Sequence, residues 1–418
     1  MNKLLTDDTK AIILLCGMLG NDRSVKPLTQ REYSNVVQWL MSRDLRPVSL
    51  LDREHTESVA IESGLDVERL TLLLDRGVQL GFAVENWHRN GIWVISRSDQ
   101  DYPVRYKRHL KDKAPPLIFG VGDRSLLRGG GVAVVGSRNV DIEGEKFTQK
   151  VGELCALNKM PVVSGGAQGV DQIAMKATLD TKGVVVGVLA DNLLKKSTER
   201  YTRNAISDKR LLLISPYHPA AHFTVGTAMG RNKLIYAMAD YGLVVSAEYK
   251  KGGTWAGAEE ELKRSKSLPI FVRVSDGIPV GNKKLLDLGA IEWPNNLKKK
   301  SLNKQLVEAA SKRNIHKKTD NLLLFDVQIQ KPSVSGDEEP KVTKKIEKDC
   351  EQKKLQKSVY EAVMPIVLAQ VSSPTTIDEL AKQLDVTKKQ LNVWVKRAVE
   401  EQKIKKLSKP VRYCKTEI

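Results

Sequence analysis

Two stretches of small residues in this 418-residue chain have the composition of a phosphate-binding turn. Gly136, Ser137 and Arg138 follow the apolar run VAVV, and Ser164-Gly165-Gly166-Ala167-Gln168-Gly169-Val170-Asp171 follows PVV. At the carboxyl end of a parallel strand, glycines let backbone N–H groups approach an anion, and the positive end of the next helix attracts it. Serine hydroxyls and the Arg138 guanidinium suit phosphate oxygens. A tight turn that needs positive φ explains either stretch alone; two such turns in successive units favour a phosphate site.

A third group, Arg231-Asn232-Lys233, opens the helical stretch LIYAMAD before the apolar run LVVSAE. Cations at the start of a helix oppose its macrodipole, so Arg231 and Lys233 together indicate an anion nearby. Surface charge is the default explanation for either residue alone. A fourth small-residue turn begins at Gly252 and leads to Glu259.

Several motifs of known chemistry do not occur in the chain. It contains no G-x-x-x-x-G-K-[ST], H-E-x-x-H, G-x-S-x-G or G-x-G-x-x-G pattern, which argues against P-loop hydrolysis, a zinc protease, a serine hydrolase and dinucleotide binding. The four cysteines, Cys16, Cys155, Cys350 and Cys414, are too widely spaced for a disulfide framework or a zinc site. We therefore expect no catalytic residues, no metal and no cofactor.

The charge of the chain indicates a polyanionic partner. Lys and Arg number 68 against 50 Asp and Glu, a net charge of +18, and a cationic surface speeds the capture of polyanions. From Lys298 onward there are 27 basic and 16 acidic residues. No apolar stretch approaches the roughly 18 residues of a membrane span, and MNKLLTDDTK lacks the pattern of a signal peptide. The sequence thus predicts a cytoplasmic protein without a membrane partner.

The pattern of apolar residues divides the chain into four parts. Residues 1–92 carry apolar residues at helical spacing and predict a small helical domain. In residues 93–297, apolar runs at 132–136, 160–165, 183–190, 210–216, 241–248 and 268–274 alternate with helical stretches, which predicts an α/β, Rossmann-like parallel sheet covered on both faces. Residues 298–353 are expected to form a charged linker.

Residues 354–418 have the pattern of a winged-helix domain, with three helices and a two-stranded ribbon. The third helix would turn a basic face outward, and this face predicts a second DNA contact that could include double-stranded DNA. A merely solvated face, or a protein-binding one, is the competing interpretation. The residues of this face are Lys388, Lys389, Asn392 and Lys396.

Taken in order, these motifs resemble those of the DNA-processing protein A family (DprA, also called Smf). The entry motif is Asp99–Tyr102-Pro103 with Pro115-Pro116-Leu117, and Gly136-Ser137-Arg138, Ser164–Asp171 and Arg231-Asn232-Lys233 follow it. The late motif is Gly281-Asn282-Lys283-Lys284-Leu285-Leu286 with Gly289-Ala290. The resemblance covers about residues 95–295, and the helical and winged-helix parts also occupy the family's positions. It implies that the helical domain of residues 1–92 is SAM/HhH-like.

This resemblance implies a Rossmann-like protein without catalysis that binds single-stranded DNA through its phosphates. It also implies a homodimer or higher oligomer that helps to load a RecA-type recombinase on DNA. The residues expected to line the DNA groove are Gly136, Ser137, Arg138, Ser164, Gly165, Gly166, Gln168, Gly169, Arg231, Asn232 and Lys233.

Departures from the family pattern leave two other hypotheses open. Lys233 stands where the family has arginine, and Ala174-Met175 replaces its Ala-His. The turn Gly252-Gly253-Thr254 with Glu259 is similar to a loop of Rossmann-like nucleotide hydrolases, so a nucleotide enzyme or sensor with Glu259 as acid/base is one alternative. The other is a divergent antitoxin or anti-phage protein that restrains a cognate toxin.

Overall fold

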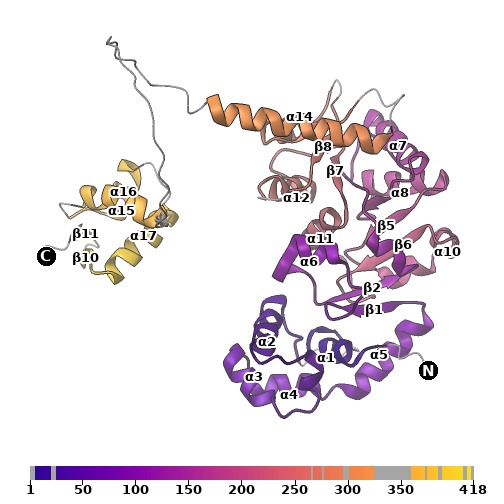
Figure 1. The fold of residues 1–418 in the computed structure, drawn as a ribbon, viewed down its shortest axis with the longest axis horizontal. Helices are drawn as coiled ribbons and strands as arrows, with labels where there is room; N and C mark the ends of the chain where they lie inside the picture. The colour runs from indigo at the N-terminus through magenta and orange to yellow at the C-terminus, as the bar shows by residue number, and fades with distance from the viewer. Residues whose placement is uncertain are drawn as a thin grey trace, which may run out of the picture. The chain divides into compact units, whose positions relative to one another are not determined.

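The computed structural model describes residues 5–19, 25–264, 267–274, 277–294, 301–323, 359–371, 374–384, 388–407 and 412–415. The chain divides into two compact units, Met1–Ile329 and Gln330–Ile418. Figure 1 shows the elements of each unit, which are described separately below. Within the described residues, no helix is both long enough and apolar enough to cross a membrane.

The first unit is built on a sheet whose described strands follow the order β1-β2-β6-β5-β4-β3-β7-β8-β9. Their bounds are β1 Trp93–Ser96, β2 Leu117–Val121, β3 Val132–Val135, β4 Val162–Ser164, β5 Val185–Val188, β6 Leu211–Ser215, β7 Tyr241–Val244, β8 Ile270–Val272 and β9 Ile291–Glu292. The seven strands from β6 to β9 in this order pair in parallel. β2 pairs antiparallel with both β1 and β6.

The sequence prediction of a parallel sheet therefore needs one correction, because β1 and β2 extend it with antiparallel strands. The six predicted strand segments each contain an observed strand, β3 to β8. Continuous valine and leucine runs mark strands that are buried on both faces. By contrast, β1 and β2 precede the run of alternating parallel strands and helices that begins at β3.

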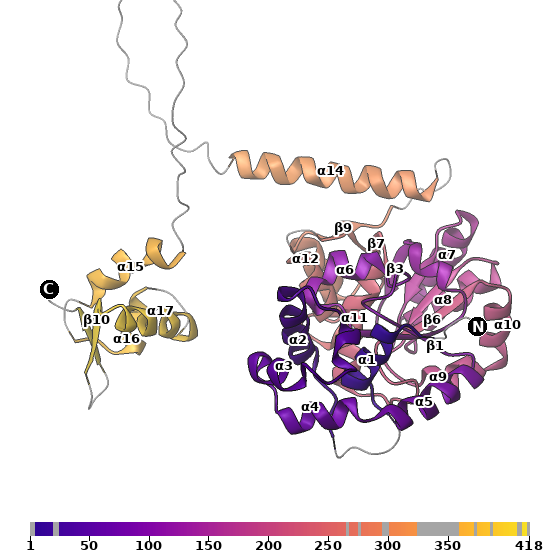
Figure 2. The same ribbon diagram turned by 60° about the horizontal axis from the view of Figure 1, so that its bottom comes forward.

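Helices cover both faces of this sheet, as Figure 2 shows. Their bounds are α6 Val104–Leu110, α7 Ile142–Leu157, α8 Val170–Asp180, α9 Leu193–Thr198, α10 Arg200–Ser207, α11 Val225–Met238, α12 Gly252–Leu262, α13 Val280–Asp287 and α14 Leu302–Leu323. Alternate residues of one strand enter different cores, as the pleat requires. Val132 and Val134 pack with α7 and α8, whereas Ala133 and Val135 pack with α11 and α12.

The N-terminal helices pack against the antiparallel edge of the sheet. They are α1 Asp7–Cys16, α2 Gln30–Ser42, α3 Thr56–Ser63, α4 Val67–Leu74 and α5 Gly77–Arg89. Trp87 of α5 meets Phe119 of β2 at 4.9 Å between ring centroids. Asp99 accepts hydrogen bonds from Thr6 and Thr9 at 2.9 and 2.7 Å. The helical segment and the sheet thus share one apolar core, within one compact unit.

Helix α14 lies in the segment for which the sequence predicts a linker. Its first turns are packed, because Leu302 and Leu306 are buried in the same core as α7. Asn303 accepts a hydrogen bond from the Tyr241 hydroxyl at 2.8 Å. The rest of the expected linker, residues 298–300 and 324–353, lies outside the described residues.

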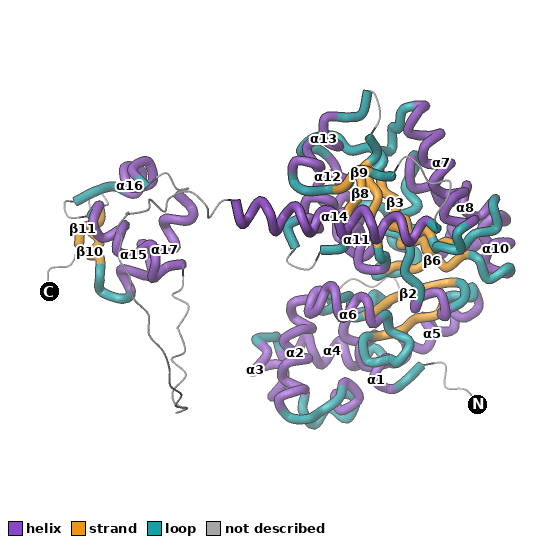
Figure 3. The backbone as a smooth tube through the Cα atoms, turned by 45° about the horizontal axis from the view of Figure 1, so that its top comes forward, coloured by secondary structure: helices purple, strands orange, loops and turns teal. Residues whose placement is uncertain are grey.

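The second unit contains α15 Val359–Gln370, α16 Ile377–Gln383, α17 Lys388–Glu400 and the antiparallel pair β10 Ile404–Leu407 and β11 Arg412–Lys415 (Figure 3). Thr376 and Glu379 form a capping box at the start of α16, which stabilises a helix N-terminus. Val367, Leu380 and Leu391 belong to its small apolar core. The order of elements matches the expected pattern, and the winged-helix assignment stays a prediction.

Candidate nucleic-acid interface

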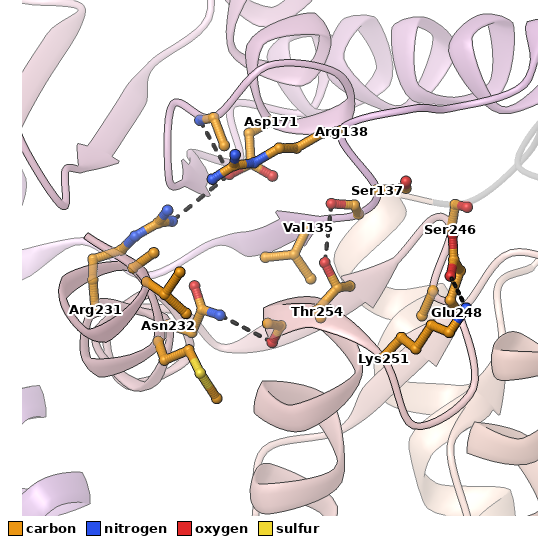
Figure 4. A pocket seen from close by; sticks show the side chains of 18 of the residues that line it. Val135, Ser137, Arg138, Asp171, Arg231, Asn232, Ser246, Glu248, Lys251 and Thr254 are labelled. Carbon is orange, nitrogen blue, oxygen red and sulfur yellow. Dashed lines mark hydrogen bonds and ion pairs between the residues drawn. The ribbon is translucent and has the colours of Figure 1, made fainter. Parts of the chain in front are cut away.

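The strand order places a crevice beside β3. From β3 the chain adds β4, β5 and β6 in one direction, and then returns to place β7 on the other side of β3. In an open α/β sheet, the loops that follow two such strands diverge, and ligands bind in the gap between them. A cavity of about 570 Å³ lies at this point, lined by residues after β3 and after β7 and by one face of α11. Figure 4 shows its lining.

The loop after β3 supplies the first wall of this cavity. Gly136 is required there, because a Cβ atom would lie 2.4 Å from the Val170 side chain at the start of α8. The carbonyl of Gly136 accepts a hydrogen bond from the Thr254 hydroxyl at 3.0 Å, which links this loop to α12. Arg138 is exposed, and its guanidinium lies 4.8 Å from the centroid of the Phe223 ring.

The loop after β4 is held by the carboxylate of Asp171. This carboxylate accepts from the backbone N–H groups of Gly165 and Ala167 at 3.1 and 3.4 Å. Those two N–H groups are therefore already used within the loop. Gly169 has a φ of +83°, and a Cβ there would lie 2.5 Å from the Ser137 carbonyl oxygen, so it lets the two loops pack together. The glycines of the loop after β4 thus mainly allow close packing of the crevice wall, and the N–H groups of Gly165 and Ala167 are not free to bind a ligand.

Arg231 of α11 faces this loop from the other side of the cavity. Its side chain is 7% exposed and its guanidinium lies 3.7 Å from the Asp171 carboxylate. The Arg231 Nε atom is buried and has no hydrogen-bond partner. Gly165 makes room for the side chain, because a Cβ at this position would lie 1.3 Å from an Arg231 guanidinium nitrogen.

Burial sets the electrostatics of this pair. It raises the pKa of Asp171, and the nearby Arg231 charge opposes that rise. It lowers the pKa of Arg231, and Asp171 opposes that fall. An arginine stays protonated in proteins, so the cavity contains a cation whose hydrogen-bonding capacity is incompletely used. A buried donor without a partner costs free energy, which an incoming anion would recover.

A second cavity of about 210 Å³ adjoins the first and shares Arg138, Ala167, Phe223 and Arg231 with it. Most of the sequence-predicted residues line one or both of the two cavities. These residues are Gly136, Ser137, Arg138 and Asn232 in the first and Arg138, Gly165, Gly166 and Gln168 in the second, with Arg231 in both. The structure thus brings the two glycine-containing loops and the Arg231 motif to one site.

Three predicted residues do not line either cavity. Ser164 is fully buried and donates its hydroxyl hydrogen to the Val134 carbonyl at 2.7 Å, so it joins β4 to β3. Gly169 has the packing role given above. Lys233 does not reach the first two cavities and lines a further cavity beside α2; burial lowers its pKa.

Comparison with known proteins relates the α/β part of the chain to a family. Residues 93–299 match the family model described as DNA recombination-mediator protein A. This part of the chain belongs to that family. It is 31% identical over 181 residues to the DNA processing protein DprA of Streptococcus pneumoniae, a match that covers 42% of this chain and 63% of the relative. It is 25% identical over 193 residues to DprA of Bacillus subtilis, covering 44% and 61%.

These matches thus span about three fifths of the length of either relative. Among solved structures, the X-ray structure of DprA from S. pneumoniae is similar in fold, with a TM-score of 0.54 and 22% identity. That likeness covers 68% of this chain and 94% of the solved one. The family description names a recombination mediator and no catalysed reaction.

The late motif of the DprA family has a positioning role in this chain. Asn282 is fully buried; its side-chain oxygen accepts from the Ala247 N–H at 2.9 Å. Its amide nitrogen donates to the Val245 and Arg273 carbonyls at 3.0 and 3.1 Å. A Cβ at Gly281 would lie 2.1 Å from the Ala247 carbonyl oxygen. The motif therefore fixes the loop after β7, which forms one wall of the cavity.

Exposed apolar residues at the rim of the cavity are absent from the sequence prediction. Phe223, Val225 and Met229 are 45%, 69% and 49% exposed, and all three line the first cavity. These residues lie just before α11 and in its first turns, and they belong to no recognised sequence motif. From sequence alone, apolar residues at such positions are expected to be buried in the core. Flat and apolar side chains beside cations are the surfaces on which unpaired bases stack.

The nucleotide-enzyme hypothesis expects Glu259 to act as acid/base beside the Gly252–Thr254 turn, and the structure does not place these residues in one cavity. Gly252, Gly253 and Thr254 line the first cavity, but Glu259 does not. The Glu259 carboxylate accepts from Lys263 at 2.8 Å and from the Trp255 indole at 3.1 Å. The Lys263 hydrogen bond holds the pKa of Glu259 below its usual range, which is the wrong direction for a general acid near neutral pH.

On α17 of the second unit, the described part of the predicted basic face is exposed. Asn392 and Lys396 face solvent, whereas Leu391, Val395 and Ala398 are buried. The side chains of Lys388 and Lys389 lie outside the described residues. A second DNA contact on this helix therefore stays a prediction. Among the residues that the structure describes, no cluster of His, Cys, Asp and Glu could hold a metal ion.

Proposed function

We propose that the chain binds single-stranded DNA at the two adjoining cavities without catalysing a reaction on it. The observation that carries this proposal is Arg231, a buried cation with an unpartnered Nε atom that lines both cavities. A backbone phosphate there would accept from Arg231, while exposed Arg138 would neutralise a neighbouring phosphate.

The rim favours a single strand over a duplex as the ligand. Phe223 and Met229 are exposed beside Arg138 at the cavity mouth. Unpaired bases can stack on such side chains in any sequence, whereas a duplex presents its backbone and keeps its bases stacked inside. The relatives, named for DNA processing, support a nucleic-acid ligand.

The test is a fluorescence-anisotropy titration of a labelled oligothymidylate over a range of salt concentrations. Arg138→Ala changes an exposed residue and should lower affinity about tenfold, roughly the value of one charge-assisted contact. Arg231→Gln combined with Asp171→Asn removes the buried pair together, so neither charge is left uncompensated. This double variant should lose more affinity than Arg138→Ala, and combining all three changes should lose the most.

Lys159→Gln with Lys209→Gln is the matched control, since both exposed lysines precede β4 and β6 at the amino ends of the strands. Thermal denaturation establishes that each variant is folded. Folded variants at Arg138, Arg231 and Asp171 with wild-type affinity would reject the site.

From the family description we extend the proposal to the role of a mediator that delivers the bound strand to a RecA-type recombinase, acting as a homodimer or higher oligomer. The expected result is faster filament formation by a RecA-type recombinase on strands coated with single-strand-binding protein. No acceleration, with DNA binding intact, would favour the alternative of an antitoxin or defence protein, for which the identity of the neighbouring gene is a direct check.

A further inference from the structure

A third cavity, of about 570 Å³, lies where the N-terminal helices meet the α/β core. One wall is the polar face of α2, with Gln30, Arg31, Ser34 and Gln38. The opposite wall comes from the turn before β2 and from α11 and α12. The side chain of Gln30 donates to the carbonyls of Asp112 and Ala114 at 3.2 and 3.0 Å, which fixes α2 against that turn.

Three cations line this cavity: Arg31, Lys113 and Lys233. Arg31 and Lys113 are exposed and Lys233 is half-buried, and the structure gives none of the three an ion pair among the described residues. Burial lowers the pKa of Lys233; the nearby Glu260 charge opposes that fall, and the Lys113 charge adds to it. Like charges held together without partners have a potential that attracts an anion.

Two acidic residues also line the cavity and reduce its charge only in part. The Glu260 carboxylate lies 3.3 Å from the Arg264 guanidinium, which offsets its charge. Asp112 is exposed. Apart from Met229, the lining carries no large apolar side chain, so the surface is suited to a hydrated sugar–phosphate chain and unsuited to the apolar core of a protein interface.

This third cavity continues from the proposed DNA site along one helix. Met229 lines both the first and the third cavity, and Lys233 lies one turn further along α11 on the same side. Ala228 and Asn232 form the adjacent side of the helix and line the first cavity. A strand that leaves the first cavity past Met229 can therefore reach Lys233 along one side of α11.

We propose that a single strand held at Arg138 and Arg231 runs over Met229 into this third cavity, where Arg31, Lys113 and Lys233 contact its next phosphates. This inference rests on the proposed function. It makes the N-terminal helices part of the DNA-binding surface.

The experiment compares full-length protein with the double variant Arg31→Gln plus Lys113→Gln, whose two side chains are exposed. Affinity is measured for oligothymidylates of about 5 and about 15 nucleotides, lengths that bracket the usual site size of one binding domain. The control, Lys159→Gln plus Lys209→Gln, removes the same charge from the opposite edge of the sheet. Each titration is repeated over a range of salt concentrations.

Wild-type protein should prefer the longer strand, and the double variant should lose about tenfold of that preference. Its salt slope for the longer strand should decrease by about 1.4, since each phosphate contact on a single strand contributes about 0.7. A double variant with the length preference and slope of the control would overturn the extended path while leaving the proposed function standing. Absence of single-strand binding in the wild-type protein would overturn both.

Discussion

At the scale of single residues, the site depends on the space left by glycines, which have no side chain. Gly165 leaves the space that the Arg231 side chain fills, and Gly136 and Gly169 let the two loops approach each other. The loop amides expected to bind phosphate instead serve Asp171. The crevice is therefore suited to bind an anion through positioned arginine side chains and not through a set of free backbone N–H groups.

This reasoning predicts the effect of Gly165→Ala. The added methyl group would displace the Arg231 guanidinium, so affinity for single-stranded DNA should fall at least tenfold in the anisotropy titration. Gly81→Ala is the control, because a Cβ there meets nothing within 4 Å in the middle of α5. That change should leave DNA affinity unaltered and stabilise the fold by about 0.5–1 kcal/mol. Equal affinities for the two variants would contradict the role of Gly165.

The sequence could foretell which residue types meet at the crevice, because motifs at the ends of neighbouring parallel strands must share one edge of the sheet. It could not foretell that Ser164 is buried or that Asp171 occupies the loop amides, since both follow from three-dimensional packing. Phe223 and Met229 escaped prediction because their exposure, not their type, makes them candidates.

At the scale of elements, α2 has a double role, because its buried face holds the N-terminal helices together and its polar face lines the third cavity. A capping box between Thr29 and Glu32 begins the helix. The same Glu32 carboxylate accepts from Arg69 of α4 at 2.7 Å. One carboxylate therefore fixes both the start of α2 and its contact with α4.

A pH dependence of stability follows from Glu32. The hydrogen bond from Arg69 lowers its pKa from 4.5 to about 2 in the folded chain. The stabilisation is therefore complete above about pH 4.5 and is lost as the pH falls toward 2. Because the pair is partly exposed, Glu32→Gln should cost only on the order of 1 kcal/mol at pH 7.

Thermal denaturation of the two proteins from pH 7 to pH 3 measures this effect. The difference in Tm should shrink as the pH drops below about 4.5, whereas Glu68→Gln, a change at an exposed α4 residue, should give no such trend. A Tm difference independent of pH would show that the carboxylate charge is not responsible.

At the scale of the whole molecule, the order of structural elements was largely foreseeable from periodicity, whereas the sheet edges and α14 were not. Strands β3 to β8 lie in short, mostly apolar runs separated by helical stretches, which is the pattern of a buried parallel sheet. Helix α14 has few apolar residues; among its described side chains, Leu302 and Leu306 are buried in the core and Ala309 packs against it. A charged composition predicts a linker for such a segment, because two buried leucines are a weak periodic signal.

The buried start of α14 decides where the chain can be shortened. A version that ends at Ile329 keeps Leu302 and Leu306, and it should bind single-stranded DNA within about threefold of the full chain at moderate salt. A version that ends at Asn296 removes both leucines and should lose about 2–5 kcal/mol or more of stability. Denaturation and anisotropy measurements on the three lengths check both expectations. Equal stability of the two shorter versions would show that α14 contributes nothing to the fold.

The two borders of the large sheet limit how copies of the protein can meet. β1 is mostly buried and contacts α1, and β9 at the other border has only two residues. Neither border offers the long row of open peptide groups on which foreign strands polymerise. Molecules crowded along one DNA strand are therefore not expected to join one another by adding strands at the borders of this sheet.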